Sequence, residues 1–237
     1  MTTYFRRICV LVLFIMSHRA TSQDFDLGSW NILNIKYTHN AKWSFFAEAQ
    51  LRSLKFYNNF HYYEYKGGIN CKVHPSAQIT IAAGSYQTYG ENGNFALPKN
   101  NDEFRLWPQV LLSQSLGRLK VEQRYRAEMR FTSNGYRNRF RYRVGLQYPF
   151  GKTTNGYKPY LAGINTEIFF TDREPYFERN RMTLTLGYKP AAAVTLQVGY
   201  LHQFDYKIND ETGRDFLQVG VYLDLKRKKS IAKPTNT

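Results

Sequence analysis

The sequence predicts an all-β protein that folds as a single antiparallel, up-and-down transmembrane β-barrel of about twelve strands, with ten strands as the alternative. Three observations favour this fold class. Long segments alternate between apolar and polar residues, the connections between them alternate in length, and aromatic residues, which favour strands, make up 16% of the 237 residues. The chain also lacks the runs of about 20 apolar residues that membrane helices need, which excludes a helical membrane bundle.

Eleven segments of the chain are candidate strands, most of them long enough to cross a membrane at a tilt. They cover residues 27–38, 43–56, 60–73, 77–89, 103–114, 119–131, 137–149, 157–170, 177–188, 194–205 and 214–225. In chain order, the alternation is clear in 43–56, unbroken in 119–131 and 137–149, and weaker in 177–188 and 214–225. Single-chain bacterial barrels have even strand numbers, so an odd count indicates a missed or split strand. A short strand near Asp24 would supply the twelfth.

The connections between the candidate strands differ in length in a regular way. Tight connections fall at residues 39–42, 74–76, 115–118 and 189–193, whereas longer ones rich in Gly, Asn and Asp fall at 90–102, 171–178 and 206–213. Short turns on one rim and long loops on the other are typical of outer-membrane barrels.

The two ends of the chain differ in composition from the predicted barrel. Arg6 and Arg7 precede an apolar run, and small residues follow it at Ala20 and Ser22, the pattern of a cleaved signal peptide. We therefore expect a signal peptide at 1–22, an outer-membrane barrel at 23–225, and a basic, disordered tail at 226–237. Export argues against nucleic acid as a partner despite the formal net charge of +15.

The charged face of the alternating segments is predicted to line the lumen. An arginine that faces lipid at mid-depth costs about 2 to 4 kcal/mol, so several of them cannot point outward. The predicted ladder comprises Glu48, Arg52, Glu103, Arg105, Lys120, Glu122, Arg124, Arg126, Glu128, Arg130, Arg139, Arg141, Arg143, Glu167, Arg179 and Arg181. We expect acids, including Glu64, to pair with these arginines across the sheet and largely to plug the lumen. On the outer face, Trp43, Tyr148 and Tyr188 suit aromatic girdles at the membrane interfaces.

The order and spacing of these charged strands resemble a known family. The residues that carry the resemblance are Trp30, Lys42-Trp43, Glu48, Arg52, Glu103 to Trp107, Glu122 to Arg126, Arg139 to Arg143, Asn165 to Glu167, and Arg179 to Arg181. Together they look like the uncharacterised bacterial outer-membrane barrels grouped as domain of unknown function 2490. The resemblance covers almost the whole mature chain and implies a barrel in the bacterial outer membrane. The family has no established activity to carry over.

The sequence contains no motif that assigns a reaction. The mature histidines are His39, His61, His74 and His202, and none has a serine held beside it by spacing. No catalytic, cofactor-binding or metal-binding residues are therefore assigned, and the segment Asn209 to Glu211 is interpreted as a solvated loop.

The function predicted from the sequence is that of a non-enzymatic, monomeric outer-membrane barrel with a charge-filled, largely plugged lumen. Two alternatives are a narrow anion-selective channel and an outer-membrane lipid-modifying enzyme. The expected partners are outer-membrane lipids, including lipopolysaccharide, for which Lys99, Arg137 and Arg173 are candidate contacts, and small anions.

Overall fold

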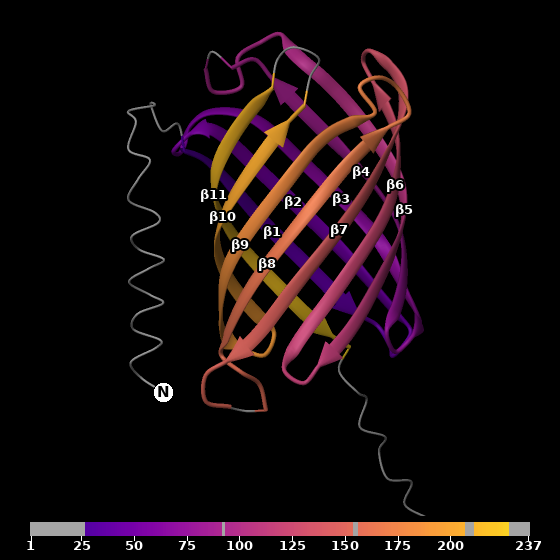
Figure 1. Ribbon diagram of the computed structural model, residues 1–237, viewed down its shortest axis with the longest axis vertical. Coiled ribbons are helices and arrows are strands. Elements are labelled where there is room, and N and C mark those ends of the chain that lie inside the picture. The colour runs from indigo at the N-terminus through magenta and orange to yellow at the C-terminus, as the bar shows by residue number, and fades with distance from the viewer. Residues whose placement is uncertain (1–26, 92, 154–155, 207–210, 228–237) are drawn as a thin grey trace, which may run out of the picture.

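The computed structural model describes residues 27–91, 93–153, 156–206 and 211–227, and these residues form one closed barrel of eleven strands (Figure 1). The strands are β1 (Leu27–Thr38), β2 (Trp43–Lys55), β3 (Asn58–His74), β4 (Ala77–Tyr89), β5 (Lys99–Leu116), β6 (Leu119–Thr132), β7 (Gly135–Phe150), β8 (Tyr160–Thr171), β9 (Phe177–Ala191), β10 (Val194–Asp205) and β11 (Thr212–Lys226). The predicted signal peptide, the additional strand near Asp24 and nearly all of the predicted tail lie outside the described residues.

The barrel closes through one parallel strand pair. Each strand pairs with its neighbour in the sequence in antiparallel register, whereas β1 and β11 pair in parallel, with Leu27 opposite Asp215 and Thr38 opposite Lys226. With an odd number of alternating strands the first and last point the same way, so a parallel pair is the arrangement that closes the sheet. The predicted all-β, up-and-down barrel is confirmed, and its eleven described strands are close to the twelve expected.

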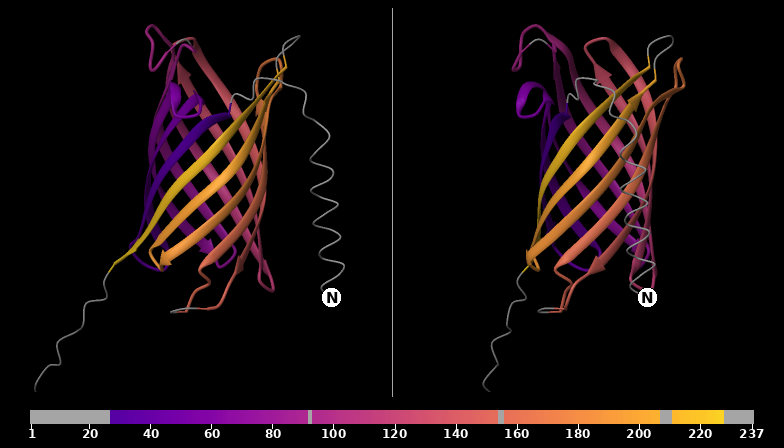
Figure 2. Two further views of the ribbon diagram at one scale, coloured as in Figure 1. Left: turned by 90° about the vertical axis from the view of Figure 1, so that its left-hand side faces the viewer. Right: turned by 60° about the vertical axis from the view of Figure 1, so that its left-hand side comes forward.

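The strands that form the wall are steeply tilted relative to the barrel axis, and the connections lie at two rims (Figures 1 and 2). The lower rim in Figure 1 holds the connections after odd-numbered strands, and the upper rim holds those after even-numbered strands. The predicted tight and long connections fall on the lower and upper rims as expected. Three further connections depart from the pattern: 56–57 and 133–134 are tight turns on the upper rim, and 151–159 is a long loop on the lower rim.

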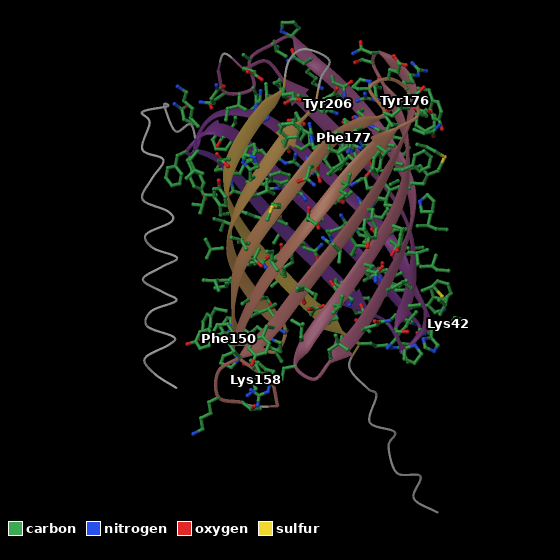
Figure 3. The ribbon with its side chains drawn as sticks, viewed as in Figure 1. Lys42, Phe150, Lys158, Tyr176, Phe177 and Tyr206 are labelled. Atoms are coloured by element: carbon green, nitrogen blue, oxygen red, sulfur yellow. The ribbon has the colours of Figure 1, made fainter. Side chains whose placement is uncertain are left out.

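The outer wall of the barrel is covered by exposed apolar side chains. Ile81 and Leu184 are 61% and 51% exposed, and both lie midway along their strands. Aromatic rings from neighbouring strands contact one another near the rims, with centroids 5.5 Å apart for Phe150 and Tyr160 and 6.0 Å apart for Phe170 and Phe177. Figure 3 shows Phe150 at the lower rim, and Phe177 and Tyr206 near the upper rim. Trp43, Tyr148 and Tyr188 are exposed, as the sequence predicts.

Within the described part of the chain, three buried apolar side chains form a small cluster inside the barrel. The ring of Trp30 on β1 meets the edge of Phe216 on β11 at 5.6 Å, and Leu201 on β10 completes the cluster. Most other inward-facing side chains are polar or charged. A water-soluble protein has the opposite arrangement, with apolar side chains inside and polar ones outside. Within the described ranges, no helix has the length and apolar character required to traverse a bilayer.

The parallel closure can be tested with a disulfide between β1 and β11. With Cys9 and Cys71 replaced by serine, Ile35→Cys with Leu223→Cys should cross-link on oxidation, because these two positions are direct partners. The control pairs Ile35→Cys with Val219→Cys, whose partner is Asn31 and which lies about 13 Å along the strand. Cross-linking is measured by gel mobility without reductant. A further strand between β1 and β11 would abolish the first cross-link and contradict the eleven-strand closure.

Candidate functional site

A cavity of about 1780 Å³ occupies the lumen and is lined by inward-facing side chains of all eleven strands. Its lining extends from His74 and Ser76 at the lower rim to Glu91 and Arg173 at the upper rim. The lining is strongly basic, with eighteen lysine and arginine side chains against ten aspartate and glutamate side chains. This lumen is the candidate functional site of the protein.

The structure places the sixteen residues of the predicted ladder inside the barrel. Fifteen of them line the cavity, and Glu128 lies among them with no exposed side-chain surface. The register of β6 against β7 brings Glu128 opposite Arg139 and Arg126 opposite Arg141. Because both strands alternate in phase, their charged faces point to the same side of the sheet.

Glu128 is the centre of the ion-pair network that crosses the middle of the lumen. Its carboxylate accepts hydrogen bonds from Arg139 Nη2 and Arg141 Nη1, each at 2.6 Å. Arg126 and Arg105 lie farther away, at 3.5 and 3.9 Å. Charge-assisted hydrogen bonds of this kind are stronger than neutral ones, and they are strengthened further where water is excluded. Four guanidinium groups therefore surround one carboxylate.

Two further carboxylates extend the network around the barrel wall. Glu167 on β8 accepts hydrogen bonds from Arg141, at 2.9 Å for both oxygens, and from Arg124. Glu103 on β5 accepts two bonds from Arg105, at 2.7 and 2.8 Å, and further bonds from Arg130. The ladder residues are thus joined to one another across β5, β6, β7 and β8.

A second cluster of charges lies on β2 and β3. Arg52 donates to Glu64 at 3.0 Å, and Glu64 also accepts bonds from Tyr62 and Lys66. Lys66 contacts Glu48 at 2.6 Å. Lys66 is absent from the predicted ladder although it shares the inward parity of Glu64, because a single lysine between glycines and tyrosines does not stand out in the sequence.

The family of the chain is identified by a comparison with family models. The model described as a protein of unknown function (DUF2490) matches residues 27–214, which span β1 to the first residues of β11. The chain belongs to the DUF2490 family. No curated protein and no solved structure matches the chain. The predicted family is therefore confirmed, and no activity is transferred from a relative.

Aromatic rings stack on the arginines inside this DUF2490 barrel. The Arg52 guanidinium lies between Trp30, at 3.4 Å, and Tyr62, at 4.0 Å. Arg181 lies 4.8 Å from both Trp30 and Phe169, although these rings come from different sides of the wall. Cation–π contacts of this kind contribute about 2 kcal/mol or more where they are desolvated. The sequence analysis did not assign these aromatic residues to the lumen. The signal that could have found them is their position, because they alternate along their strands in step with the inward-facing charged residues.

Arg143 differs from the other central arginines of this DUF2490 barrel. It lines the cavity beside Arg124 and Glu167, its partners in the sheet register. Among the described residues, however, no hydrogen bond or ion pair reaches its guanidinium. The Nε atom of Arg124 is also buried without a hydrogen-bond partner. Two guanidinium groups in this part of the lumen therefore have hydrogen-bond donors without a protein acceptor among the described residues.

The basic residues proposed to contact lipopolysaccharide lie at the upper rim. Lys99 approaches Asp102 at 3.3 Å, and Arg173 donates to the backbone carbonyl of Tyr136 at 2.8 Å. Arg137, the third candidate, lines the mouth of the cavity. The adjoining connection is fixed by Asn138, whose side-chain amide donates to Asp172 at 2.8 Å and lowers the pKa of that carboxyl.

The histidines of this DUF2490 barrel do not assemble a hydrolase triad within the described part of the chain. His202 Nδ1 lies 2.8 Å from Asp215 on the outer wall, and Tyr200 donates to the same carboxylate oxygen at 2.5 Å. His74 contacts Ser76 at 2.7 Å within a lower-rim turn, without an acid that would orient the ring. No grouping of three or more His, Cys, Asp or Glu side chains suited to a metal occurs among the described residues.

The network makes a stability prediction for Glu128. Glu128→Gln should lower the free energy of unfolding by about 3 to 5 kcal/mol, because it puts a neutral amide among four guanidinium groups and leaves Arg139 and Arg141 with one carboxylate each, Glu178 and Glu167. Glu122→Gln is the matched control, with an expected effect below about 1 kcal/mol, since its partner Lys120 is 45% exposed. The measurement is equilibrium urea titration of the refolded protein. Equal losses in both variants would contradict a network centred on Glu128.

Proposed function

We propose that this protein is an integral barrel of the bacterial outer membrane and that ion pairs at mid-height close its lumen to ion flow. The observation that carries the proposal is that the inner face of the wall is charged and the outer face is apolar, the opposite of a water-soluble barrel. The face toward the cavity holds eighteen basic and ten acidic side chains, whereas the outer face exposes large apolar residues along its whole height. A wall whose inner face is charged and whose outer face is apolar is suited to water inside the barrel and lipid around it.

The outer face supports the membrane part of the proposal. Soluble monomers rarely expose contiguous apolar patches of more than a few hundred Å², whereas here apolar residues are exposed on all sides of the barrel. The strands have 12 to 18 residues, enough for the 9 to 11 or so of a tilted membrane strand with extensions beyond each interface. Aromatic contacts near both rims suit the interfaces of a bilayer.

The packing at mid-height supports a closed lumen. Glu128 and Phe169 have essentially no exposed side-chain surface, and Trp107 is 1% exposed. Their arginine partners reach from β5, β6, β7 and β9, so the filling comes from several sides of the wall. An eight-stranded barrel is filled by side chains and a barrel of sixteen strands leaves a channel, so long charged side chains are needed to fill an intermediate one.

The location and partners follow from the same reasoning. Closed barrels that span a bilayer are typical of the bacterial outer membrane, and the predicted signal peptide supplies the export that this location requires. We expect the lower rim, with most of the tight turns, to face the periplasm. The protein would then act as a monomer among outer-membrane lipids, with Lys99, Arg137 and Arg173 near the lipopolysaccharide layer.

A narrow anion-selective channel is the second candidate, and one observation favours it. The cavity has lining residues at both rims, and its basic side chains outnumber its acidic ones by eighteen to ten. A low-dielectric wall concentrates the field of such an excess, so a continuous pore would prefer anions.

Planar-bilayer conductance of the refolded protein tests the closed lumen. We expect no conductance above the background of the lipid for the wild type, because the buried ion pairs obstruct the path at mid-height. Steady conductance would contradict the closed lumen. Reversal potentials in a chloride gradient would then test the channel, with anion preference expected and cation preference excluding it. Heat-modifiable gel mobility of the same preparation establishes that the barrel has folded.

A substitution on the outer wall tests the membrane part separately. Leu184→Arg should lower stability in phospholipid vesicles by about 2 to 4 kcal/mol, since Leu184 lies at the middle of β9 and would bring a charge to the bilayer centre. Leu97→Arg makes the same change in the upper-rim connection, where Leu97 is 79% exposed, and should alter stability by less than about 1 kcal/mol. Urea titration in vesicles gives both values. A soluble barrel would tolerate both substitutions equally.

A further inference from the structure

Arg143, near the middle of β7, faces the lumen without a hydrogen bond or ion pair to any described residue. Arg139 and Arg141 bond to Glu128, and Arg124 and Arg141 bond to Glu167. Arg143 continues the same inward face of β7 but makes no hydrogen bond or ion pair with any described residue. A guanidinium group offers five N–H donors in a fixed plane, so Arg143 has its full donor capacity available to the cavity.

The nearby acids are already engaged by other cations. Glu167 is held by Arg141 and Arg124, and Glu122 lies 2.6 Å from Lys120. Across the lumen, Glu48 lies 2.6 Å from Lys66. Each carboxylate in this layer therefore has a bonded partner, and Arg143 is within electrostatic reach of Glu122 and Glu167 but forms no hydrogen bond with either.

Space for a ligand lies directly below Arg143. Two inward-facing glycines, Gly145 on β7 and Gly163 on β8, line the cavity there, and the side chains of Asn165 and Thr185 lie beside them. Gly145 is the next inward position after Arg143 on β7, so β7 itself places no side chain immediately beneath the guanidinium. We call this part of the cavity, bounded above by Arg143 and lined by Gly145 and Gly163, the lower chamber.

The remaining walls of the lower chamber are polar. Gln147, Asn165, Gln197 and Tyr222 line the cavity, and within the described ranges their side chains make no hydrogen bonds. Tyr222, on β11, is within electrostatic reach of Arg143, Glu48 and Lys66. Amide and phenol groups free to donate hydrogen bonds, next to an unpaired arginine, suit oxygen atoms that carry negative charge.

We propose that the lower chamber binds a small soluble anion bearing a carboxylate or phosphate group, with Arg143 as its main contact. The planar guanidinium binds two oxygens of such a group side by side, which a lysine does not. The ligand enters from the lower rim, where Lys189 and Thr195 line the mouth of the cavity. This inference goes beyond the proposed function, because binding from one side requires no conduction through the barrel.

Isothermal titration calorimetry of the full-length protein in detergent micelles tests the site, with inorganic phosphate and succinate as separate probes. Arg143→Gln should weaken binding of the preferred probe at least tenfold, and Arg143→Lys should weaken it less. Arg137→Gln is the matched control, because it removes the same charge from the same strand near the upper rim, and it should change affinity less than twofold. Arg143 has no bonded partner, so all three variants should keep heat-modifiable mobility.

Three results would overturn the proposal: no binding of either probe by the wild type, unchanged binding by Arg143→Gln, or equal weakening by Arg143→Gln and Arg137→Gln. The last result would mean that the general charge of the lumen, and no particular site, attracts anions. The preferred probe distinguishes a phosphate site from a carboxylate site. A protein that binds the anion but also conducts would refute the closed lumen alone, so the two proposals fail independently.

Discussion

The carboxylate of Glu128 lies 2.6 Å from the guanidinium groups of both Arg139 and Arg141 and has no exposed side-chain surface. A buried charge of either sign is costly unless it is paired and hydrogen-bonded, so each of these residues depends on the others. The same constraint extends to Glu167, which binds Arg124 and Arg141, and to Glu103, which binds Arg105 and Arg130. The interior of this barrel is therefore held by mutual charge compensation in the place where a soluble domain has an apolar core.

The alternation that brings charges inward also determines what the outer wall presents. Because successive side chains in a strand point to opposite faces, an inward series such as Arg139 to Arg143 leaves Phe140 and Tyr142 on the outside. The parallel pair of β1 with β11 completes the wall and leaves no free strand edge. A continuous apolar exterior and a closed backbone are the two conditions that a lipid bilayer imposes on strands.

The excess of basic over acidic side chains in the lumen links the possible functions. Where carboxylates lie within reach, the arginines form ion pairs with them, and these pairs fill the lumen at mid-height. Below this level the acids are already paired, and Arg143 lines the cavity without a hydrogen bond to any described residue. A closed barrel with an anion-binding chamber and a narrow anion pore are thus two outcomes of one charge distribution. The two differ in one respect, which is whether the open space continues through the lumen at mid-height.

The sequence by itself determined the strand segments, the inward face of the segments that alternate most clearly, and the family. Period-two alternation is a property of one strand and can be read without knowing which strands lie beside it. It did not determine the closure, since the pairing of β1 with β11 joins the two ends of the sheet and leaves no local signal. Arg141 and Arg143 are indistinguishable in the pattern, yet Arg141 bonds to two carboxylates and Arg143 to none. The tertiary structure decided this difference, because the reach of each side chain across the lumen depends on register and curvature among strands that are distant in sequence.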